Sequence, residues 1–204
     1  MISIINYGLG NIKAFTNIYK KLNIPVEVVS SAEELKNAKK LILPGVGSFD
    51  HAMTLLSTSG MKELLDELVL VKKVPIIGIC VGLQMLADSS EEGKLPGLGW
   101  IHGKVKKFDH ASLPHGTILP HMGWNTIQAN RNSYLFEFLP DNSRFYFLHT
   151  YYFECINDNN ILTTTNYGVE FTSAVNENNI YGVQFHPEKS HSNGTQLLKN
   201  FANL

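Results

Sequence analysis

The sequence predicts an α/β protein with a parallel or mixed central sheet flanked by helices. In the first half, short apolar runs alternate with stretches of helical periodicity, a pattern typical of parallel strands joined by helices on both faces. After Gly97 and Gly99 the runs become shorter, aromatic and β-branched, which favours antiparallel or mixed pairing. The 204 residues, 44% hydrophobic and 17% charged, suit one globular domain over 1–204 with a sizeable core.

The first half supplies the parallel part of the sheet. Ser30 and Ser31 each precede a glutamate, Glu33 and Glu34 respectively, by three residues, which is the spacing of a capping box that begins a helix. Around them the pattern predicts strands at 2–6, 26–29, 41–43 and 76–79, a helix at 12–22, a helical pair at about 50–72 and a further helix beginning at 81.

The second half supplies the remaining strands. Its runs predict strands at 103–108, 144–149, 161–166, 172–176 and 180–184, and a closing helix near 194–203. There are no repeats, low-complexity segments or linkers. We therefore expect no second domain.

Cys80 has the sequence context of a nucleophile on a sharp strand-to-helix turn. It follows an apolar run and lies between Gly78 and Gly82. Such an elbow lifts its side chain out of the sheet on a strained backbone, and the residues two before and two after crowd each other unless both are small. The alternative is a buried cysteine that acts as a small hydrophobe.

His186 and Glu188 form a second constellation, directly after the strand predicted at 180–184. This spacing lets an imidazole face a thiol while the carboxylate bonds the other ring nitrogen and fixes its orientation. An imidazolium beside sulfur would lower the thiol pKa from its free value of about 8.5. The alternative is a solvated loop histidine before a proline.

A glycine-containing turn follows the strand at 41–43. Gly45 and Gly47 free backbone N–H groups to point at a ligand, and together with an N–H at the elbow they would hold a developing oxyanion. The alternative is an ordinary strand-to-helix turn, where Gly and Pro are common.

Composition and motifs argue against several other functions. The net charge of −1, without a basic cluster, disfavours nucleic acid, and no apolar run approaches the roughly 20 residues that span a bilayer. We expect a soluble cytoplasmic protein with no membrane partner. The eight histidines and two cysteines show no metal-ligand spacing, and Cys155 is interpreted as structural. Gly8 and Gly10 lack the third glycine of a dinucleotide fingerprint, so no cofactor is expected.

These motifs resemble the class I glutamine amidotransferases of the triad type, with Cys80, His186 and Glu188 matching nucleophile, base and orienting carboxylate. Within that class the chain looks like the glutaminase subunits of imidazole glycerol phosphate synthase. The matching blocks occur in family order over nearly the whole chain: 44–49, 78–84, 120–125, 146–152 and 184–190. The resemblance implies a flavodoxin-like fold and hydrolysis of L-glutamine through a Cys80 thioester.

The resemblance also implies the other site residues. The oxyanion would be held by backbone N–H groups near Gly47 and Val81. Gln84 and Glu92 match positions that contact the substrate glutamine, Glu92 at its ammonium group. The backbone of Thr150 and Tyr151 matches a segment that holds the substrate carboxylate.

The partner implied by the resemblance is a (β/α)₈ barrel cyclase subunit in a heterodimer. Trp124, Tyr146 and Lys189 would face that barrel, although Trp124 is equally compatible with a core position. The barrel would use the ammonia to make imidazole glycerol phosphate and AICAR in histidine biosynthesis.

Three alternatives stay open, one of which is a non-catalytic binding module, favoured only if Cys80 is unreactive in the presence of every candidate partner. Most family members carry Asp where this chain has Asn6, and the stretches 87–100 and 147–155 look like a paralogous branch that supplies ammonia for amidating a surface-polysaccharide sugar. A free-standing cysteine hydrolase would also suit the triad, but such an enzyme has no reason to keep Gln84 with Glu92.

Overall fold

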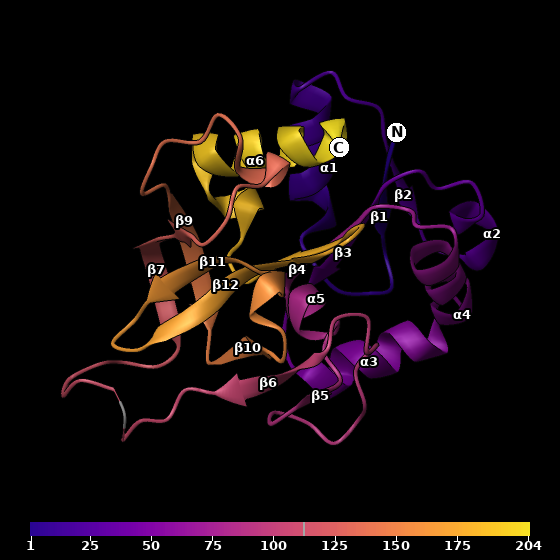
Figure 1. Cartoon of the computed structure of the whole chain (residues 1–204). Helices are drawn as coiled ribbons and strands as arrows, with labels where there is room; N and C mark the ends of the chain where they lie inside the picture. The colour runs from indigo at the N-terminus through magenta and orange to yellow at the C-terminus, as the bar shows by residue number, and fades with distance from the viewer. Residues whose placement is uncertain (112) are drawn as a thin grey trace.

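The computed structural model describes residues 1–111 and 113–204. Within these residues, eleven strands form one twisted sheet in the order β2-β1-β3-β4-β13-β12-β10-β6-β5, with β11 and β8 added beside β12 (Figure 1). Two further strands, β7 and β9, form a small separate sheet. The predicted fold class, α/β with a parallel and mixed central sheet, is confirmed.

The parallel half of the sheet is made by strands β2-β1-β3-β4-β13, each parallel to its neighbours within this set. The strands β1, β3 and β4 are completely buried, as expected for strands covered on both faces. The bounds are β1 Ile2–Ile5, β2 Val26–Val29, β3 Leu41–Gly45, β4 Ile76–Cys80 and β13 Ile180–Val183.

Helices cover both faces of these strands. Figure 1 shows α1 and α6, from the two ends of the chain, packed together on one face, and α3 and α5 on the other. The bounds are α1 Ile12–Lys21, α2 Ala32–Leu35, α3 Phe49–Thr58, α4 Lys62–Asp66, α5 Val81–Gln84 and α6 His191–Asn203. Among the described residues, no helix combines the length and apolar character needed to cross a membrane.

The other half of the sheet is mainly antiparallel. Here β12 joins β13 to β10, and β10 joins β12 to β6, all through antiparallel pairs. The bounds are β5 Ser89–Ser90, β6 Gly103–Lys107, β8 Gln128–Ala129, β10 Tyr151–Cys155, β11 Ile161–Asn166 and β12 Glu170–Glu177. The separate sheet pairs β7 His121–Thr126 with β9 Arg144–His149.

Several predicted bounds need correction. The helix predicted to begin at 81 is a single turn, α5, because the chain bends back toward the strand pair β5 and β6. The helical pair at 50–72 becomes α3 and α4 followed by a π-helical turn, Glu67–Val71. The closing helix α6 begins at His191, three residues earlier than predicted.

Ser31 caps α2, but the capping box is offset. The Ser31 hydroxyl accepts a hydrogen bond from the Glu34 backbone N–H at 3.3 Å, while the Glu34 carboxylate accepts one from the Ser30 N–H at 2.7 Å. Each serine therefore supplies one half of the reciprocal arrangement that the sequence predicted.

Candidate active site

Cys80 ends β4 and directly precedes α5, on a strained backbone with φ 54° and ψ −108°. A Cβ on Gly78 would come within 2.5 Å of the Gly82 carbonyl oxygen, and one on Gly82 would overlap the Leu43 carbonyl oxygen. The two positions flanking Cys80 therefore have room only for glycine. This close packing holds a positive φ at Cys80 that a non-glycine residue adopts only under constraint.

His186 lies beside Cys80 because β13, which leads to it, pairs in parallel with β4. Its Nδ1 is 2.8 Å from Oε1 of Glu188, and the two side chains are only 3% and 2% exposed. Burial by itself lowers the pKa of His186, but hydrogen bonds to Cys80 and Glu188 outweigh it and raise that pKa above 6.5. Nδ1–H donates to the carboxylate, so the other ring nitrogen is the one that hydrogen-bonds to Cys80.

Ser190 fastens the segment that carries the histidine to strand β9. Its hydroxyl donates to the His186 carbonyl oxygen at 2.6 Å and accepts from the Tyr146 N–H at 2.9 Å. The His186 N–H in turn donates to the Tyr146 carbonyl oxygen at 2.8 Å. These bonds fix the imidazole through its own backbone, independently of the carboxylate.

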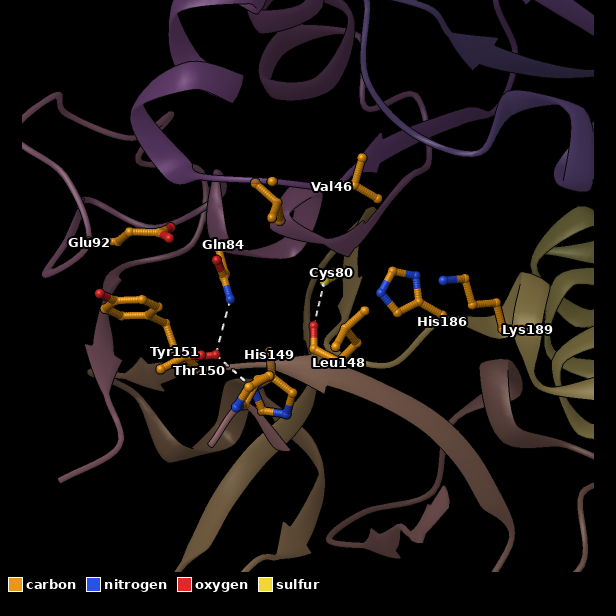
Figure 2. A pocket seen from close by; sticks show the side chains of 13 residues that line it. Val46, Cys80, Gln84, Glu92, Leu148, His149, Thr150, Tyr151, His186 and Lys189 are labelled. Atoms are coloured by element: carbon orange, nitrogen blue, oxygen red, sulfur yellow. Dashed lines mark hydrogen bonds between the residues drawn. The ribbon is translucent and has the colours of Figure 1, made fainter. Parts of the chain in front are cut away.

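A pocket of about 280 Å³ opens over these groups. Figure 2 shows Glu92, Gln84 and Tyr151 at one end, His186 and Lys189 at the other, and Cys80 between them. The lining residues are Val46, Gly47, Cys80, Val81, Gln84, Glu92, Pro120, Leu148, His149, Thr150, Tyr151, His186 and Lys189. Every residue predicted for the triad, the oxyanion and the substrate except the buried carboxylate Glu188 lines this one pocket.

Two amide side chains connect the floor of the pocket to the sulfur. Gln84 Nε2 lies 3.1 Å from the Tyr151 carbonyl oxygen and 3.2 Å from Gln184 Oε1. Gln184 Nε2 is 3.7 Å from Cys80 Sγ. The Gln184 amide was missed as a site residue, although it directly follows β13 and lies two residues before His186.

The carboxylate of Glu92 is held at the edge of the pocket by α3. Its Oε2 accepts a hydrogen bond from the Phe49 N–H at 2.8 Å. The N-terminal end of a helix favours a negative charge at this position. Glu92 thereby places a carboxylate opposite Cys80 along the pocket (Figure 2).

Gly47 and Val81 line the pocket from two different segments, a loop and the start of α5. Gly47 has φ +92°, and a Cβ there would meet no atom within 4 Å, so glycine is favoured for conformational freedom. Val81 begins α5, so its N–H is among those that a helix leaves without an internal partner. The loop residue Gly47 and the helix-end residue Val81 thus line the same pocket as Cys80.

His149 is a second pocket residue that the sequence did not single out. Its Nδ1 lies 2.8 Å from the Tyr151 carbonyl oxygen, which fixes the turn through Thr150 (Figure 2). Burial, followed by the neighbouring His121, lowers the pKa of His149 to about 3. The ring is therefore neutral and structural at physiological pH.

An apolar strip on the β7–β9 sheet runs from the pocket to the surface. Opposite pairs across the two strands are Met122 with Leu148 and Trp124 with Tyr146. Trp124 is 38% exposed and Met122 is 63% exposed, so the tryptophan is not a core residue. Lys189 Nζ lies 5.7 Å from the centre of the Tyr146 ring, which connects the strip to the pocket.

Other candidates are separate from this site. Cys155 is a free cysteine, and burial is the largest cause that raises its pKa, to about 12. Gly10 packs against Pro44, with a Cβ position 2.5 Å from that ring, which accounts for a glycine in the loop after β1. Among the residues described, no group of three or more His, Cys, Asp or Glu side chains could hold a metal ion.

Comparisons with known proteins agree with this geometry. The family model described as glutamine amidotransferase class-I matches residues 3–204. The chain is 56% identical over 204 residues to the imidazole glycerol phosphate synthase subunit HisH of Bdellovibrio bacteriovorus, with 100% of both chains covered. It is 52% identical to the HisH subunit of Leptospira interrogans, again over 204 residues and 100% of both chains.

A solved structure described as a glutamine amidotransferase superposes with a TM-score of 0.76 at 18% identity, covering 100% of this chain and 99% of the other. At this identity the likeness concerns the fold. The chain belongs to the class-I glutamine amidotransferases and, within them, to the family of imidazole glycerol phosphate synthase HisH subunits.

Proposed function

We propose that this chain is the glutaminase subunit of an imidazole glycerol phosphate synthase, with Cys80, His186 and Glu188 as its catalytic residues. The observation that carries the proposal is the junction of β4 and β13, where adjacent parallel strands bring the cysteine and the histidine to one pocket. A nucleophile, a base and an orienting carboxylate in this arrangement suit acyl transfer.

Glutamine fits the pocket lengthwise. Its ammonium group lies at the Glu92 carboxylate, and its carboxylate lies against the Thr150–Tyr151 backbone and near Gln84. Its carboxamide then reaches Cys80, at the middle of the pocket (Figure 2). The leaving nitrogen faces the end with His186 and Lys189.

The first half-reaction forms a thioester. Cys80 Sγ, as the thiolate, bonds to the carboxamide carbon, and the carbonyl π electrons move onto oxygen. Backbone N–H groups of Gly47 and Val81 stabilise that oxyanion. The oxyanion collapses, the C–N bond breaks, and the imidazolium of His186 gives its proton to the nitrogen, which leaves as ammonia.

The second half-reaction releases glutamate. His186, now neutral, takes a proton from a water molecule while the water oxygen bonds to the thioester carbon. Collapse of the second tetrahedral intermediate breaks the C–S bond and returns the thiolate beside an imidazolium. Glu188 stays ionised throughout and holds the ring in the orientation that both steps require.

Ammonia passes from this site to a (β/α)₈ barrel cyclase subunit, which uses it to make imidazole glycerol phosphate and AICAR. The strip of Met122, Trp124, Tyr146 and Leu148 is the proposed docking surface for the barrel, with Lys189 at its edge. Aromatic residues and methionine are enriched at the centres of such interfaces. Direct transfer avoids bulk water, where ammonia would be largely protonated and unreactive.

We also place the complex in the cytoplasm. Both cysteines are free, which suits a reducing compartment. The isolated subunit is expected to turn glutamine over poorly, because the oxyanion donors become correctly aimed only after the barrel and its ligand bind.

The test is glutamate release from glutamine by the purified chain, alone and mixed with the histidine-pathway barrel subunit plus its nucleotide substrate. Strong stimulation supports both the ammonia-donor role and the partnership. Equal rates with and without the barrel would contradict the activation step. Stimulation only by the barrel of the polysaccharide branch would keep the chemistry but assign it to the other pathway.

A further inference from the structure

The loop that carries Glu92 is anchored on two sides by its own carboxylates. It follows β5 and passes between β6 and the start of α3 (Figure 1). Glu91 bonds to β6, through the Lys107 N–H at 2.9 Å and Lys104 Nζ at 3.2 Å. Glu92 turns the opposite way and accepts from the Phe49 N–H at 2.8 Å. Consecutive carboxylates thus fix the loop between a strand and a helix.

Asp50, the residue after Phe49, holds the same loop from the helix side. Its Oδ1 accepts from the Lys94 N–H at 3.0 Å and the Leu95 N–H at 3.1 Å, and its Oδ2 accepts from the Lys94 N–H at 2.9 Å. A Cβ on Gly93 would overlap the Asp50 carboxylate, so the loop backbone lies directly against it. Asp50 itself does not line the pocket.

The bonds to Phe49 and Asp50 cross between the same two segments in opposite directions. A loop carboxylate binds the helix backbone, and a helix carboxylate binds the loop backbone. Glu92 Oε2 is occupied by Phe49, which leaves Oε1 for a cation in the pocket. Rotation of the Glu92 side chain would give up the Phe49 bond, while displacement of its backbone would break the bonds to Asp50.

We propose that Asp50 is a positioning residue that holds Glu92 for recognition of the amino group of glutamine. This inference rests on the proposed function. Asp50 never meets the substrate, and it acts by keeping the 93–95 backbone, and hence the adjacent Glu92, at a fixed distance from Cys80. Its contribution is confined to the end of the pocket that receives the substrate's ammonium group.

The alternative is that Asp50 only stabilises the loop or the start of α3. The two roles predict different effects on the hydrolysis of a substrate that lacks the amino group. The compound 4-carbamoylbutanoate has the carboxamide and carboxylate of glutamine but no amino group. If Asp50 positions Glu92, loss of Asp50 changes the kinetics of glutamine hydrolysis and leaves hydrolysis of this analogue unchanged. General damage to the pocket slows hydrolysis of both compounds.

The experiment measures kcat and KM for both compounds in the complex with the barrel subunit and its nucleotide substrate, at enzyme concentrations that allow the slower analogue to be followed. For Asp50→Ala we expect KM for glutamine to rise roughly tenfold, the size expected for one misplaced charge-assisted hydrogen bond. We expect kcat for glutamine and kcat/KM for the analogue to stay within about twofold. Asp50→Asn keeps an acceptor oxygen and should recover most of the loss.

Gly93→Ala is the second variant, because its methyl group displaces the Asp50 carboxylate without removing it, and the same selective loss is expected. Glu63→Gln, on the exposed side of α4, is the matched control and should change neither substrate. Equal losses of kcat/KM for both compounds, or an unchanged KM for glutamine in the folded Asp50→Ala and Gly93→Ala variants, would contradict the positioning role of Asp50 but not the proposed function. A wild-type complex that released no glutamate would overturn the proposed function as well.

Discussion

His121 Nδ1 lies 3.0 Å from His149 Nε2, and both rings are buried. The direction of this hydrogen bond follows from its surroundings. His149 Nδ1 meets the Tyr151 carbonyl oxygen, so it carries the proton, and its Nε2 must accept from His121. His121 Nε2 is then an acceptor for Asn125 Nδ2 at 3.2 Å. The whole chain of donors points toward the turn that lines the glutamine pocket.

Acid should destabilise the protein through this pair. Burial is the main cause that lowers the pKa of His121 from 6.5 to about 4 and that of His149 to about 3. Between the pKa of a histidine in the unfolded chain, 6.5, and its lower pKa in the folded chain, the unfolded chain therefore binds more protons than the folded one. The stability is fully present above about pH 6.5 and is lost as the pH falls toward 4. His121→Phe should reduce the pH slope of the unfolding free energy by up to about 1.4 kcal/mol per unit.

Urea unfolding at intervals between pH 7 and pH 4.5 measures this slope. At pH 7 the same variant should lose about 1–3 kcal/mol, because His149 Nε2 is left without a donor, while the stacking of the ring on Phe147 and Tyr167 is kept. His115→Phe, at an exposed position, is the control. An unchanged slope in His121→Phe would contradict the assignment of neutral rings.

Glu188→Gln should slow glutamine hydrolysis without unfolding the site. The amide oxygen can still accept from His186 Nδ1–H, but the charge that helps raise the histidine pKa is gone. Turnover should fall by up to roughly 10⁴-fold, the loss found when the orienting carboxylate of a serine protease triad is neutralised. The measurement is kcat for glutamate release, with ammonia-dependent synthesis by the barrel as control. A parallel loss of ammonia-dependent synthesis would point to a damaged interface instead.

Cys80→Ala and Cys80→Gly should both abolish glutamine-dependent synthesis while synthesis from added ammonia continues. The two variants should nevertheless differ in stability, because position 80 has φ 54°. Relief of backbone strain, about 1–3 kcal/mol, outweighs the extra freedom of glycine in the unfolded chain, about 0.4–1 kcal/mol. Cys80→Gly should therefore unfold at a higher urea concentration than Cys80→Ala, and the reverse order would mean that the elbow is unstrained.

Trp124→Ala should weaken binding to the barrel subunit. A partly exposed tryptophan in the strip has the character of an interface hot spot, so a loss of about 2 kcal/mol, roughly thirtyfold in Kd, is expected. Titration calorimetry measures it. Ile156→Ala, at a residue 76% exposed outside the strip, should leave the affinity unchanged. Equal effects of the two substitutions on the affinity would contradict the assignment of the strip as the docking surface.

The parallel half of the fold was predictable because its central strands β1, β3 and β4 are buried on both faces and are formed by mainly apolar runs. Strand β7 was not predicted. Its sequence, with His121, Gly123 and Asn125 on one side, lacks an apolar inner face. The residues of β9 opposite that side are a histidine and two phenylalanines rather than aliphatic residues. Single-sequence periodicity carries little information about such a strand.

The proposed triad could be named from the sequence because each member lies in a local motif whose chemistry depends on spacing. The supporting groups were not, because their roles arise between distant segments. Asp50 acts on a loop more than forty positions further along the chain, and His149 pairs with a histidine on another strand. Such pairings depend on the path of the chain in space, which no local pattern describes.

The position of β13 between β4 and β12 has a consequence for protein synthesis. The ribosome delivers Cys80 early, with β4, but the proposed base and carboxylate, His186 and Glu188, are made only after β13, which lies between β4 and β12. On the proposed mechanism, a nascent chain therefore carries the nucleophilic thiol without the base that activates it. We expect incomplete polypeptides to hydrolyse no free glutamine, because the proposed site is complete only when β13 has joined the sheet.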